Sequence, residues 1–360
     1  MLSPILEKIK NTIPNQFDKN ITDLKQSNLP VYFYGAGIAG KNIKKTLKDN
    51  YINIDSFVVD DNCYKQGDIE GKPVYSLSGA LASDVSVNFV VADCDYSEKI
   101  ENRHKHNFFI FDGTQIVSPF PDYYDYVKKN VSGFEKLYNQ LADELSKKVL
   151  IGFINAKISS NPQRLSALNV KNEKQYLPSF FEIGENEVLI DCGAYDGDFS
   201  LSFTTLMKPK VIYAFECDPE NFKKLEKNTS HLDNIHIFEK GCWSRKAILS
   251  FSNCGTMASK IDSDGQVKIE ADSIDNIVQD AATFIKMDVE GAELEVLKGA
   301  RNTILKYAPK LAISVYHLKE DLISIPQYIL SLNGKYELYL RHYESFSSEL
   351  ILYANPKQGK

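Results

Sequence analysis

The sequence predicts an α/β protein that contains two Rossmann-like domains. Three observations support this prediction. The chain has 360 residues, which is long enough for two domains that each bury a core of their own. In each half an apolar run leads into a turn that contains glycines and then into a helical segment. Further strands alternate with helical segments along both halves, as in parallel sheets that helices cover.

Three parts are expected along the chain. Residues 1–125 are predicted to form an N-terminal helix and a first Rossmann-like domain. Residues 126–180 are predicted to form a helical linker, because Pro119 and Pro121 break the strand pattern just before them. Residues 181–360 are predicted to form a second domain with a seven-stranded sheet. Its last two strands follow each other closely, which indicates an antiparallel closing strand.

The elements of the first domain can be read in order. Apolar residues at near-helical spacing over residues 1–28 predict a helical lead-in. The apolar run VYFY at 31–34 predicts a strand, the glycines after it a tight turn, and KNIKKTLKDN at 41–50 a helix. The stretches NIDSFVVDDN, VSVNFVVAD and FFIFDG predict three further strands.

The turn after the first strand carries the pattern GxGxxG at Gly35, Gly37 and Gly40. Asp60 follows 20 residues beyond Gly40, at the end of the next predicted strand. This spacing is typical of a dinucleotide-binding fingerprint, so an NAD-dependent oxidoreductase is one alternative for the whole protein. The pair Asp60 and Asp61, with GKPVYSL after it, also resembles the nucleotide-sugar-binding half of bacterial sugar acyltransferases. That resemblance implies a nucleotide or nucleotide-sugar ligand, while a purely structural domain remains equally open.

Seven strands are predicted in the second half. Helical segments follow the first, second, fourth and fifth of them. The seven segments are EVLIDCG, KVIYAFECD, NIHIFEKG, TFIKMDVEG, KLAISVYH, YELYLRHY and ELILYAN.

Charge and hydropathy exclude several classes of partner. The chain has 42 Lys and Arg against 48 Asp and Glu, a net charge of −6, so no general attraction to nucleic acid or anionic lipid is expected. No apolar run approaches the ~18 residues that a membrane span needs, and the first residues lack the apolar stretch of a secretory signal. We therefore predict a cytoplasmic protein with neither a nucleic-acid partner nor a membrane span. The six cysteines show no CxxC pair and no metal-ligand spacing, so buried thiols and no metal site are expected.

The second domain opens with a turn suited to a ligand. In VLIDCGAYDGDFS an apolar strand runs into Asp191, Gly193 and Gly197, and a helix then starts. Glycines let the backbone approach a ligand closely, and the free amides of a helix N-terminus suit an anionic group. Glu216 ends the next strand, where a carboxylate can accept both ribose hydroxyls. The pattern predicts a nucleoside site.

Five separated segments resemble the FkbM family of S-adenosylmethionine-dependent methyltransferases. They are TFIKMDVEGAELEVLKGA, AISVYH, IPQYI, YLRHY and LYA, within residues 174–354. The resemblance implies a class I methyltransferase fold with S-adenosylmethionine as cofactor. It also implies methyl transfer to a hydroxyl of a sugar, nucleotide sugar or surface-glycan precursor. A non-catalytic nucleotide-sugar-binding protein with a degenerate second half is a further alternative.

The resemblance assigns cofactor residues one by one. It implies that Asp191, Gly193, Ala194 and Gly197 form the loop on the methionine side and that Glu216 holds the ribose. The adenine is expected against the segment after the third strand, and a segment before the first strand is expected to close over the cofactor. These two groups are Gly241, Cys242 and Trp243, and Gln175 and Tyr176.

Catalytic and acceptor residues are expected at three later strand ends. Lys286, Asp288 and Glu290 alternate in an extended segment, so they are predicted on one face at the pocket floor, Asp288 with a catalytic role. His317 is the expected base, because the usual histidine pKa lies near working pH. Lys286 and Glu290 are expected to contact the acceptor, and a further pair to hold an acidic or phosphorylated acceptor: Arg341 and His342. Asp288, Glu290 and His317 offer ligands that suit divalent ions, but no spacing signature supports a metal.

Overall fold

The computed structural model describes residues 4–9, 15–35, 38–92, 105–111, 123–161, 163–170, 173–252, 260–261, 267–344 and 348–357. The chain forms two compact units. The first comprises Met1–Val131, Lys148–Asn169 and Tyr343–Ser348, and the second comprises Ser132–Lys147, Val170–His342 and Glu349–Lys360. Strands and helices alternate in both units, which confirms the predicted mixed α/β class. None of the described helices combines the length and the hydropathy that crossing a membrane requires.

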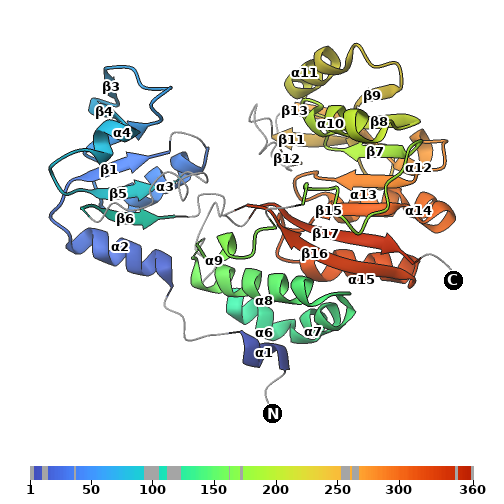
Figure 1. The fold of residues 1–360 in the computed structure, drawn as a ribbon, viewed down its shortest axis with the longest axis horizontal. Helices are drawn as coiled ribbons and strands as arrows, with labels where there is room; N and C mark the ends of the chain where they lie inside the picture. The colour runs from blue at the N-terminus through green and yellow to red at the C-terminus, as the bar shows by residue number, and fades with distance from the viewer. Residues whose placement is uncertain are drawn as a thin grey trace. The chain divides into compact units, whose positions relative to one another are not determined.

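The first unit contains a six-stranded sheet in the order β3-β4-β2-β1-β5-β6 (Figure 1). All neighbouring strands are parallel except β3 and β4, which pair antiparallel. Strands β1, β2, β5 and β6 were predicted from the sequence, whereas the short strands β3 and β4 were not. The elements of this part of the chain are α1 (Pro4–Lys8), α2 (Gln16–Gln26), β1 (Val31–Tyr34), α3 (Ile38–Asp49), β2 (Ser56–Val59), β3 (Asp68–Ile69), β4 (Lys72–Ser76), α4 (Leu77–Leu81), β5 (Asn88–Val91), β6 (Asn107–Ile110) and α6 (Tyr123–Lys129).

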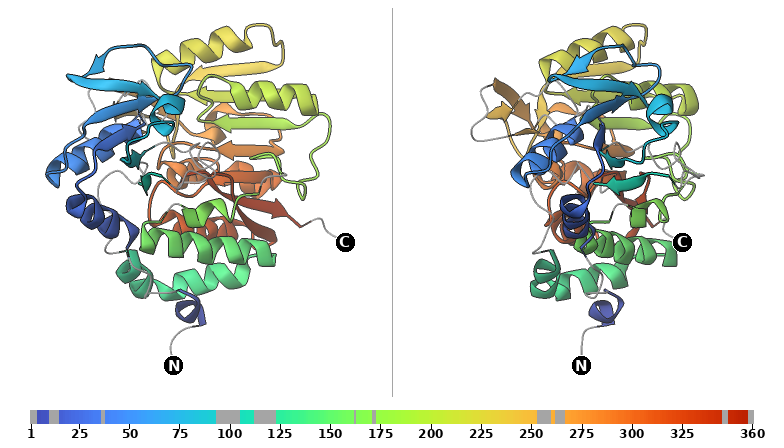
Figure 2. Two further views of the ribbon diagram at one scale, coloured as in Figure 1. Left: turned by 60° about the vertical axis from the view of Figure 1, so that its left-hand side comes forward. Right: turned by 90° about the vertical axis from the view of Figure 1, so that its left-hand side faces the viewer.

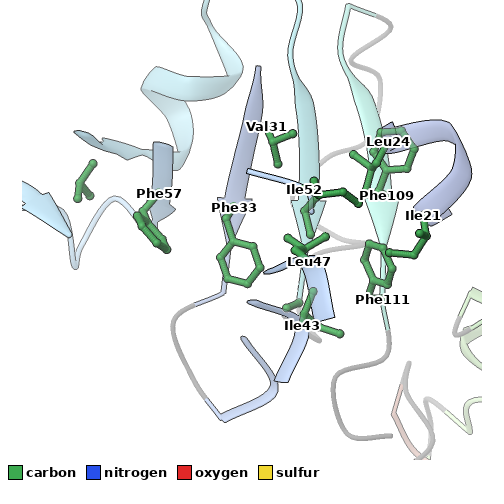
Figure 3. Packing of buried hydrophobic residues seen from close by; sticks show 13 residues of the cluster. Ile21, Leu24, Val31, Phe33, Ile43, Leu47, Ile52, Phe57, Phe109 and Phe111 are labelled. Carbon is green, nitrogen blue, oxygen red and sulfur yellow. The ribbon is translucent and has the colours of Figure 1, made fainter. Parts of the chain in front are cut away.

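Apolar side chains cover both faces of this sheet. On one face Ile43 and Leu47 of α3 pack with Phe33 of β1, and α2 adds Ile21 and Leu24 to the same cluster (Figure 3). On the other face α4 contributes a second buried cluster. Successive residues of a strand point to opposite faces, so the unbroken apolar runs of β1 and β5 reflect burial on both sides.

The second unit is built on a seven-stranded sheet in the order β16-β17-β15-β14-β7-β8-β9 (Figure 1). Strand β17 runs antiparallel to both β15 and β16, and the remaining neighbours are parallel. Six of the seven segments predicted as strands contain one of these strands, and the seventh covers β17 up to the residue before Pro356. The sheet and its helices are β7 (Val188–Cys192), α10 (Asp198–Met207), β8 (Val211–Glu216), α11 (Pro219–Thr229), β9 (Ile235–Glu239), β14 (Phe284–Met287), α13 (Glu293–Gly299), α14 (Arg301–Tyr307), β15 (Lys310–Ser314), α15 (Asp321–Leu332), β16 (Tyr336–His342) and β17 (Leu350–Pro356).

Further elements lie between and beside these. The helices α7 (Val131–Gln140), α8 (Glu144–Ser159) and α9 (Gln163–Ser166) precede β7. A small four-stranded sheet in the order β10-β13-β11-β12, which the sequence analysis missed, projects from the side of the larger sheet (Figure 2). It consists of β10 (Gly241–Cys242), β11 (Ala247–Ser252), β12 (Lys260–Ile261) and β13 (Val267–Asp272), followed by the short helix α12 (Ile274–Ile277).

Replacing Gly40 by alanine is expected to destabilise the first unit. A Cβ atom there would lie 1.8 Å from the carbonyl oxygen of Gly35, so backbone must move to admit it. We expect a loss of about 1–3 kcal/mol and faster hydrogen exchange of the amides in β1 and α3. Gly184→Ala is the control, because a Cβ at Gly184 meets no atom within 4 Å. Equal exchange in the two variants would contradict the close packing at Gly40.

Candidate active site

The carboxyl ends of four neighbouring parallel strands meet at one edge of the larger sheet. Strands β14 and β7 are adjacent, with β15 beyond β14 and β8 beyond β7. The chain passes from β7 to β8 on one side and returns to β14 on the other, so the strand order reverses between β7 and β14. Ligands of open α/β sheets bind in the crevice at such a reversal. The residues that follow these four strand ends therefore define the candidate site.

The turn from β7 into α10 lies in close contact with the ends of both neighbouring strands, β14 and β8. Gly193 has φ +76°, and a Cβ there would lie 1.9 Å from the carbonyl oxygen of Asp288. The N–H groups of Gly193 and Ala194 both donate to the carbonyl of Phe215 in β8, at 3.0 and 2.9 Å. Gly197 adopts φ +90° directly before the helix. Only glycine fits the first position without displacing backbone, which explains the sequence pattern.

A buried ion pair lies beneath this turn. Lys286 Nζ lies 3.1 Å from Asp191 Oδ1, and the two side chains are 6% and 0% exposed. The same ammonium donates to the carbonyl of Gly193 at 2.7 Å. The hydroxyl of Ser200 donates to Asp191 Oδ2 at 2.7 Å. Burial alone would lower the pKa of Lys286, but Asp191 and Asp288 raise it, so the ammonium stays charged.

These contacts differ from the expected roles of both residues. Asp191 was expected to face a ligand and Lys286 to contact the acceptor, but both point into the interior and hold each other. Asp191 and Lys286 are register partners on β7 and β14, so their ion pair holds the turn in place. A strand-end charge can thus shape a site without lining it.

Glu216, at the end of β8, is held by the backbone on two sides. Its Oε2 accepts the N–H of Tyr195 at 2.9 Å and its Oε1 accepts the N–H of Asp218 at 2.8 Å. Burial raises the pKa of Glu216 to about 6. Each carboxylate oxygen has two lone pairs, so each retains one acceptor position. A preorganised carboxylate of this kind fits the vicinal hydroxyls of a ribose.

The segment after β9 lies beside the residue that follows Glu216. A Cβ at Gly241 would be 3.8 Å from the Cβ of Cys217. Cys242 is buried, and burial raises the pKa of its thiol. The N–H of Trp243 donates to the carbonyl of Asp272 at 2.8 Å. The structure thus brings Gly241 to the Glu216 side of the edge, while the Cys242 thiol is packed inside.

Gln175 and Tyr176 reach the β14 and β15 side of the edge. The Tyr176 hydroxyl donates to Asp288 Oδ2 at 3.0 Å, and its N–H donates to the hydroxyl of Tyr353 at 3.0 Å. Gln175 Nε2 donates to the Glu349 carboxylate. The Lys286 ammonium lies 5.3 Å from the Tyr176 ring centroid. Both residues are therefore grouped with Asp288 rather than with Glu216.

Asp288, Glu290, Glu293 and His317 form what we call the carboxylate–histidine cluster. His317 Nδ1 lies 2.8 Å from Glu293 Oε1, and its Nε2 lies 3.6 Å from Asp288 Oδ1 and 3.5 Å from Glu290 Oε2. The cluster joins the loop after β14 and the start of α13 to the segment after β15. Sequence reasoning found three members and missed Glu293, which begins α13 and reads as an ordinary acidic residue of a helix's first turn.

The charge state of His317 differs from the one expected for a base. Burial alone would lower the pKa of His317, but Glu293, through its charge and hydrogen bond, together with Asp288 and Glu290 raises it to about 10. Burial raises the pKa of Glu290 to about 7, against the opposing effect of His317. An imidazolium cannot accept a proton. The raised pKa favours the imidazolium form of His317, and its role as the base stays a prediction.

Arg341 and His342 are not at this edge. Arg341 Nη2 lies 2.7 Å from Asp143 Oδ2, and Arg341 Nη1 donates to the hydroxyl of Ser146 at 2.8 Å. Both Arg341 and His342 are buried on β16, beyond β17 in the sheet order. The Arg341 guanidinium thus binds a carboxylate inside the unit, and the expected contact of Arg341 and His342 with an acceptor stays a prediction.

The glycine motif of the first unit is only partly described. Gly35 has φ +123°, Gly40 lies against it, and Gly37 falls outside the described residues. Asp60 Oδ1 accepts the Tyr34 hydroxyl at 2.8 Å. Asp61 Oδ1 accepts the N–H of Ser78 at 2.9 Å, a bond that lowers the pKa of Asp61. These residues lie at the carboxyl ends of β1 and β2, as their spacing predicts.

Comparison with known families identifies a methyltransferase domain in the second unit. More specifically, residues 191–343 match the family model described as "Methyltransferase FkbM domain". The match begins at Asp191 and extends past β16, so it contains every strand end described above. A methyltransferase domain in the C-terminal half, as the sequence resemblance implied, is thereby confirmed.

Two curated relatives agree with this assignment. The hexuronic acid methyltransferase AglP of Haloferax volcanii is 30% identical over 131 residues, which cover 34% of this chain and 54% of that protein. The 2-O-methyltransferase NoeI of Sinorhizobium fredii is 26% identical over 144 residues, 33% of this chain and 59% of that protein. The chain thus spans about half the length of the curated relatives it matches.

The solved structure shares the fold over nearly the whole chain. It is a methyltransferase FkbM from Methylobacillus flagellatus KT, with a TM-score of 0.71 and 23% identity, covering 95% of this chain and 94% of that one.

Replacing Lys286 by methionine is expected to destabilise the second unit strongly. The change leaves the Asp191 carboxylate buried without its cation, which typically costs about 3–5 kcal/mol. The control is Lys210→Met, which removes an exposed pair with Asp280 and is expected to cost less than about 1 kcal/mol. Urea unfolding followed by the fluorescence of the single tryptophan, Trp243, measures both. Equal losses would contradict the bracing role of Lys286.

Proposed function

We propose that this protein is an S-adenosylmethionine-dependent O-methyltransferase that acts on a hydroxyl of a sugar, a nucleotide sugar or a surface-glycan precursor. The observation that carries the proposal is the FkbM domain match over residues 191–343, which covers the edge where the Gly193 turn, Glu216 and the carboxylate–histidine cluster gather. The names of the two curated relatives, a hexuronic acid methyltransferase and a 2-O-methyltransferase, support a sugar hydroxyl as the acceptor.

The cofactor fits the Glu216 side of the edge. In this proposal Glu216 accepts the ribose hydroxyls with its two remaining acceptor positions, and the turn from Gly193 to Gly197, with Ala194, receives the methionine end. Gly241 and Trp243 border the adenine, with Cys242 packed behind them. Asp191 acts indirectly, because its pair with Lys286 holds the Gly193 carbonyl and thereby the turn. Gln175 and Tyr176 close the opposite side through Glu349 and Asp288.

Placement of the acceptor is the main task of the remaining residues. The bound cofactor supplies a methyl group on a sulfonium, which reacts by in-line displacement. Correct placement of two reactants contributes up to about 7–11 kcal/mol, whereas a general base contributes about 10²–10⁴ in rate, or roughly 3–5 kcal/mol. We assign this placement to Asp288, whose carboxylate the Tyr176 hydroxyl orients, and to His317 beside it.

The first unit is proposed to be a Rossmann-like domain for a nucleotide or nucleotide sugar. Support comes from its strand order, because β4-β2-β1-β5-β6 repeats the order 3-2-1-4-5 of dinucleotide-binding folds. Gly40 packs against Gly35 as the third glycine of such motifs does. We retain the division into 1–125, 126–180 and 181–360, a class I methyltransferase sheet and a cytoplasmic location as parts of this proposal.

Two measurements separate the proposal from an NAD-dependent oxidoreductase. Calorimetric titration of the full chain with S-adenosylhomocysteine and with NADH is expected to show binding of the first at the second unit. Incubation of the protein with a metabolite extract and a donor that carries a trideuterated methyl group should then replace one hydroxyl hydrogen of a sugar-containing product by a CD3 group. Binding of NADH without S-adenosylhomocysteine, and no deuterated product, would overturn the methyltransferase proposal.

The affinity for S-adenosylhomocysteine is expected to fall as pH drops below about 6. The pKa of Glu216 in the folded protein is about 6, and its ionised form accepts hydroxyls best. Between pH 7.5 and pH 5 the loss should therefore be about tenfold. Glu216→Gln is expected to bind more weakly, with no dependence on pH in this window.

Stability gives an independent check on the same variant. Because the pKa of Glu216 is raised above its ordinary value of 4.5, its ionisation opposes folding, and stability is lost as pH rises from about 4.5 to 6. Glu216→Gln should remove this loss. An affinity for S-adenosylhomocysteine that depends on pH equally in the wild type and Glu216→Gln would exclude Glu216 as the ribose ligand.

A further inference from the structure

The carboxylate–histidine cluster has an unsatisfied nitrogen at its centre. The His317 side chain is only 9% exposed. Its Nε2 makes no hydrogen bond with any atom of the described residues, although it points between Asp288 Oδ1 at 3.6 Å and Glu290 Oε2 at 3.5 Å. A buried polar atom without a hydrogen-bond partner lowers the stability of the folded state, and native proteins rarely contain one. The position therefore indicates a group that binds there.

Glu293 fixes the orientation of the His317 ring and therefore the direction of its Nε2. Its Oε1 lies 2.8 Å from His317 Nδ1 and also accepts the N–H of Val289 at 3.0 Å and of Gly291 at 3.4 Å. A carboxylate can only accept, so Nδ1 must carry the proton in this contact. The Nε2 lone pair is then available whenever that atom is deprotonated. A carboxylate behind the distal nitrogen of a histidine is the usual support for a metal ligand.

The surroundings are rich in negative charge. Three carboxylates of the cluster face one imidazole, and Tyr316, whose hydroxyl lies 3.5 Å from Asp288 Oδ1, also contacts Glu349 Oε1 at 3.3 Å. The nearby Lys286 ammonium is paired with Asp191. Asp321, also buried, adds a carboxyl close enough to Glu293 to have its pKa raised to about 7, chiefly by burial and then by Glu293. A bound cation would neutralise this surplus.

The two distances from His317 Nε2 suit ligands of one ion. Ligand atoms that lie about 2.1 Å from a small divalent cation are at most about 4.2 Å apart, and a separation near 3.5 Å corresponds to an angle of roughly 115°. The separations from His317 Nε2 to both carboxylate oxygens fall in that range. The ligand atoms of Asp288, Glu293 and His317 also lie within 4.8 Å of one another. Glu293 Oε2 has no hydrogen-bond partner among the described residues. Glu293 nevertheless faces Nδ1 through Oε1, which accepts three N–H groups, so we assign it to orienting His317 and take Glu290, whose Oε2 lies beside Nε2, as the third ligand.

We propose that Asp288 Oδ1, Glu290 Oε2 and His317 Nε2 bind one divalent cation of the Mn²⁺ or Zn²⁺ type, with Glu293 as the residue that positions His317. Oxygen and imidazole ligands together suit these ions. Three protein ligands leave coordination positions open for a substrate. Resting on the proposed function, the cation would bind two neighbouring oxygens of the acceptor, which selects sugars with a vicinal diol or a hydroxyl next to a carboxylate. A hydroxyl bound to a divalent cation also loses its proton more readily.

The test uses metal alone, so it does not depend on methyl transfer. The full chain, treated with a chelator and dialysed, is titrated with Mn²⁺ followed by electron paramagnetic resonance and with Zn²⁺ followed by calorimetry, without cofactor or acceptor. The wild type is expected to bind one equivalent of at least one of these ions. His317→Ala and Glu290→Gln should each weaken binding at least about tenfold, and Glu293→Gln about 10–100-fold, as other variants of supporting carboxylates do.

Control variants distinguish metal binding at this site from non-specific binding elsewhere and from loss of the fold. His231→Ala removes an exposed imidazole in the turn after α11 and should leave metal affinity unchanged. Thermal unfolding followed by circular dichroism shows whether each variant folds, and added metal should raise the midpoint of the wild type but not of His317→Ala. Absence of stoichiometric binding of either ion, or binding that survives His317→Ala and Glu290→Gln, would overturn the proposal. Metal binding without any methyl transfer would count against the proposed function alone.

Discussion

The buried pair of Lys286 and Asp191 is the constraint on which the site depends. It joins β14 to β7 at the place where the strand order reverses, and its ammonium also holds the carbonyl of Gly193. The turn cannot shift without separating two charges in an interior that water does not reach, where an unpaired charge is costly. Both halves of the site, Glu216 on one side and Asp288 on the other, are positioned relative to that turn.

Much of the second unit could be predicted from local patterns. Its seven main strands are apolar runs bounded by glycine, proline or charged residues, and burial on both faces makes such runs easy to recognise. The topology then determines which strand ends meet, so Gly193, Glu216, Asp288 and His317 could be assigned to one edge before any contact was known. The small sheet of β10 to β13 was not predicted, because β10 and β12 have only two residues each and because β11 and β13 pair with each other apart from the main sheet.

Contacts between distant residues could not be predicted in this way. Arg341 carries a charge within a strand and reads as a ligand-binding residue, but its partner Asp143 lies 198 positions away. Glu293 reads as an acidic residue at the start of a helix, and only its contact with His317, in the segment after β15, shows that it supports that histidine. The charge of His317 is likewise a property of its neighbours, since burial and three carboxylates act on its pKa in opposite directions.

The antiparallel insertion of β17 between β15 and β16 bears on how the second unit assembles during synthesis. Apart from one bridge between Leu338 and Leu141, strand β16 pairs with β17 among the described residues, so it gains its partner strand only when residues Leu350–Pro356 have left the ribosome. The parallel strands β9, β8, β7, β14 and β15 can associate earlier. Until β17 is synthesised, the outer edge of β15 stays unpaired and apolar. Nascent chains halted just before residue 350 should therefore be prone to aggregation and chaperone capture, because an unpaired strand edge readily recruits another chain.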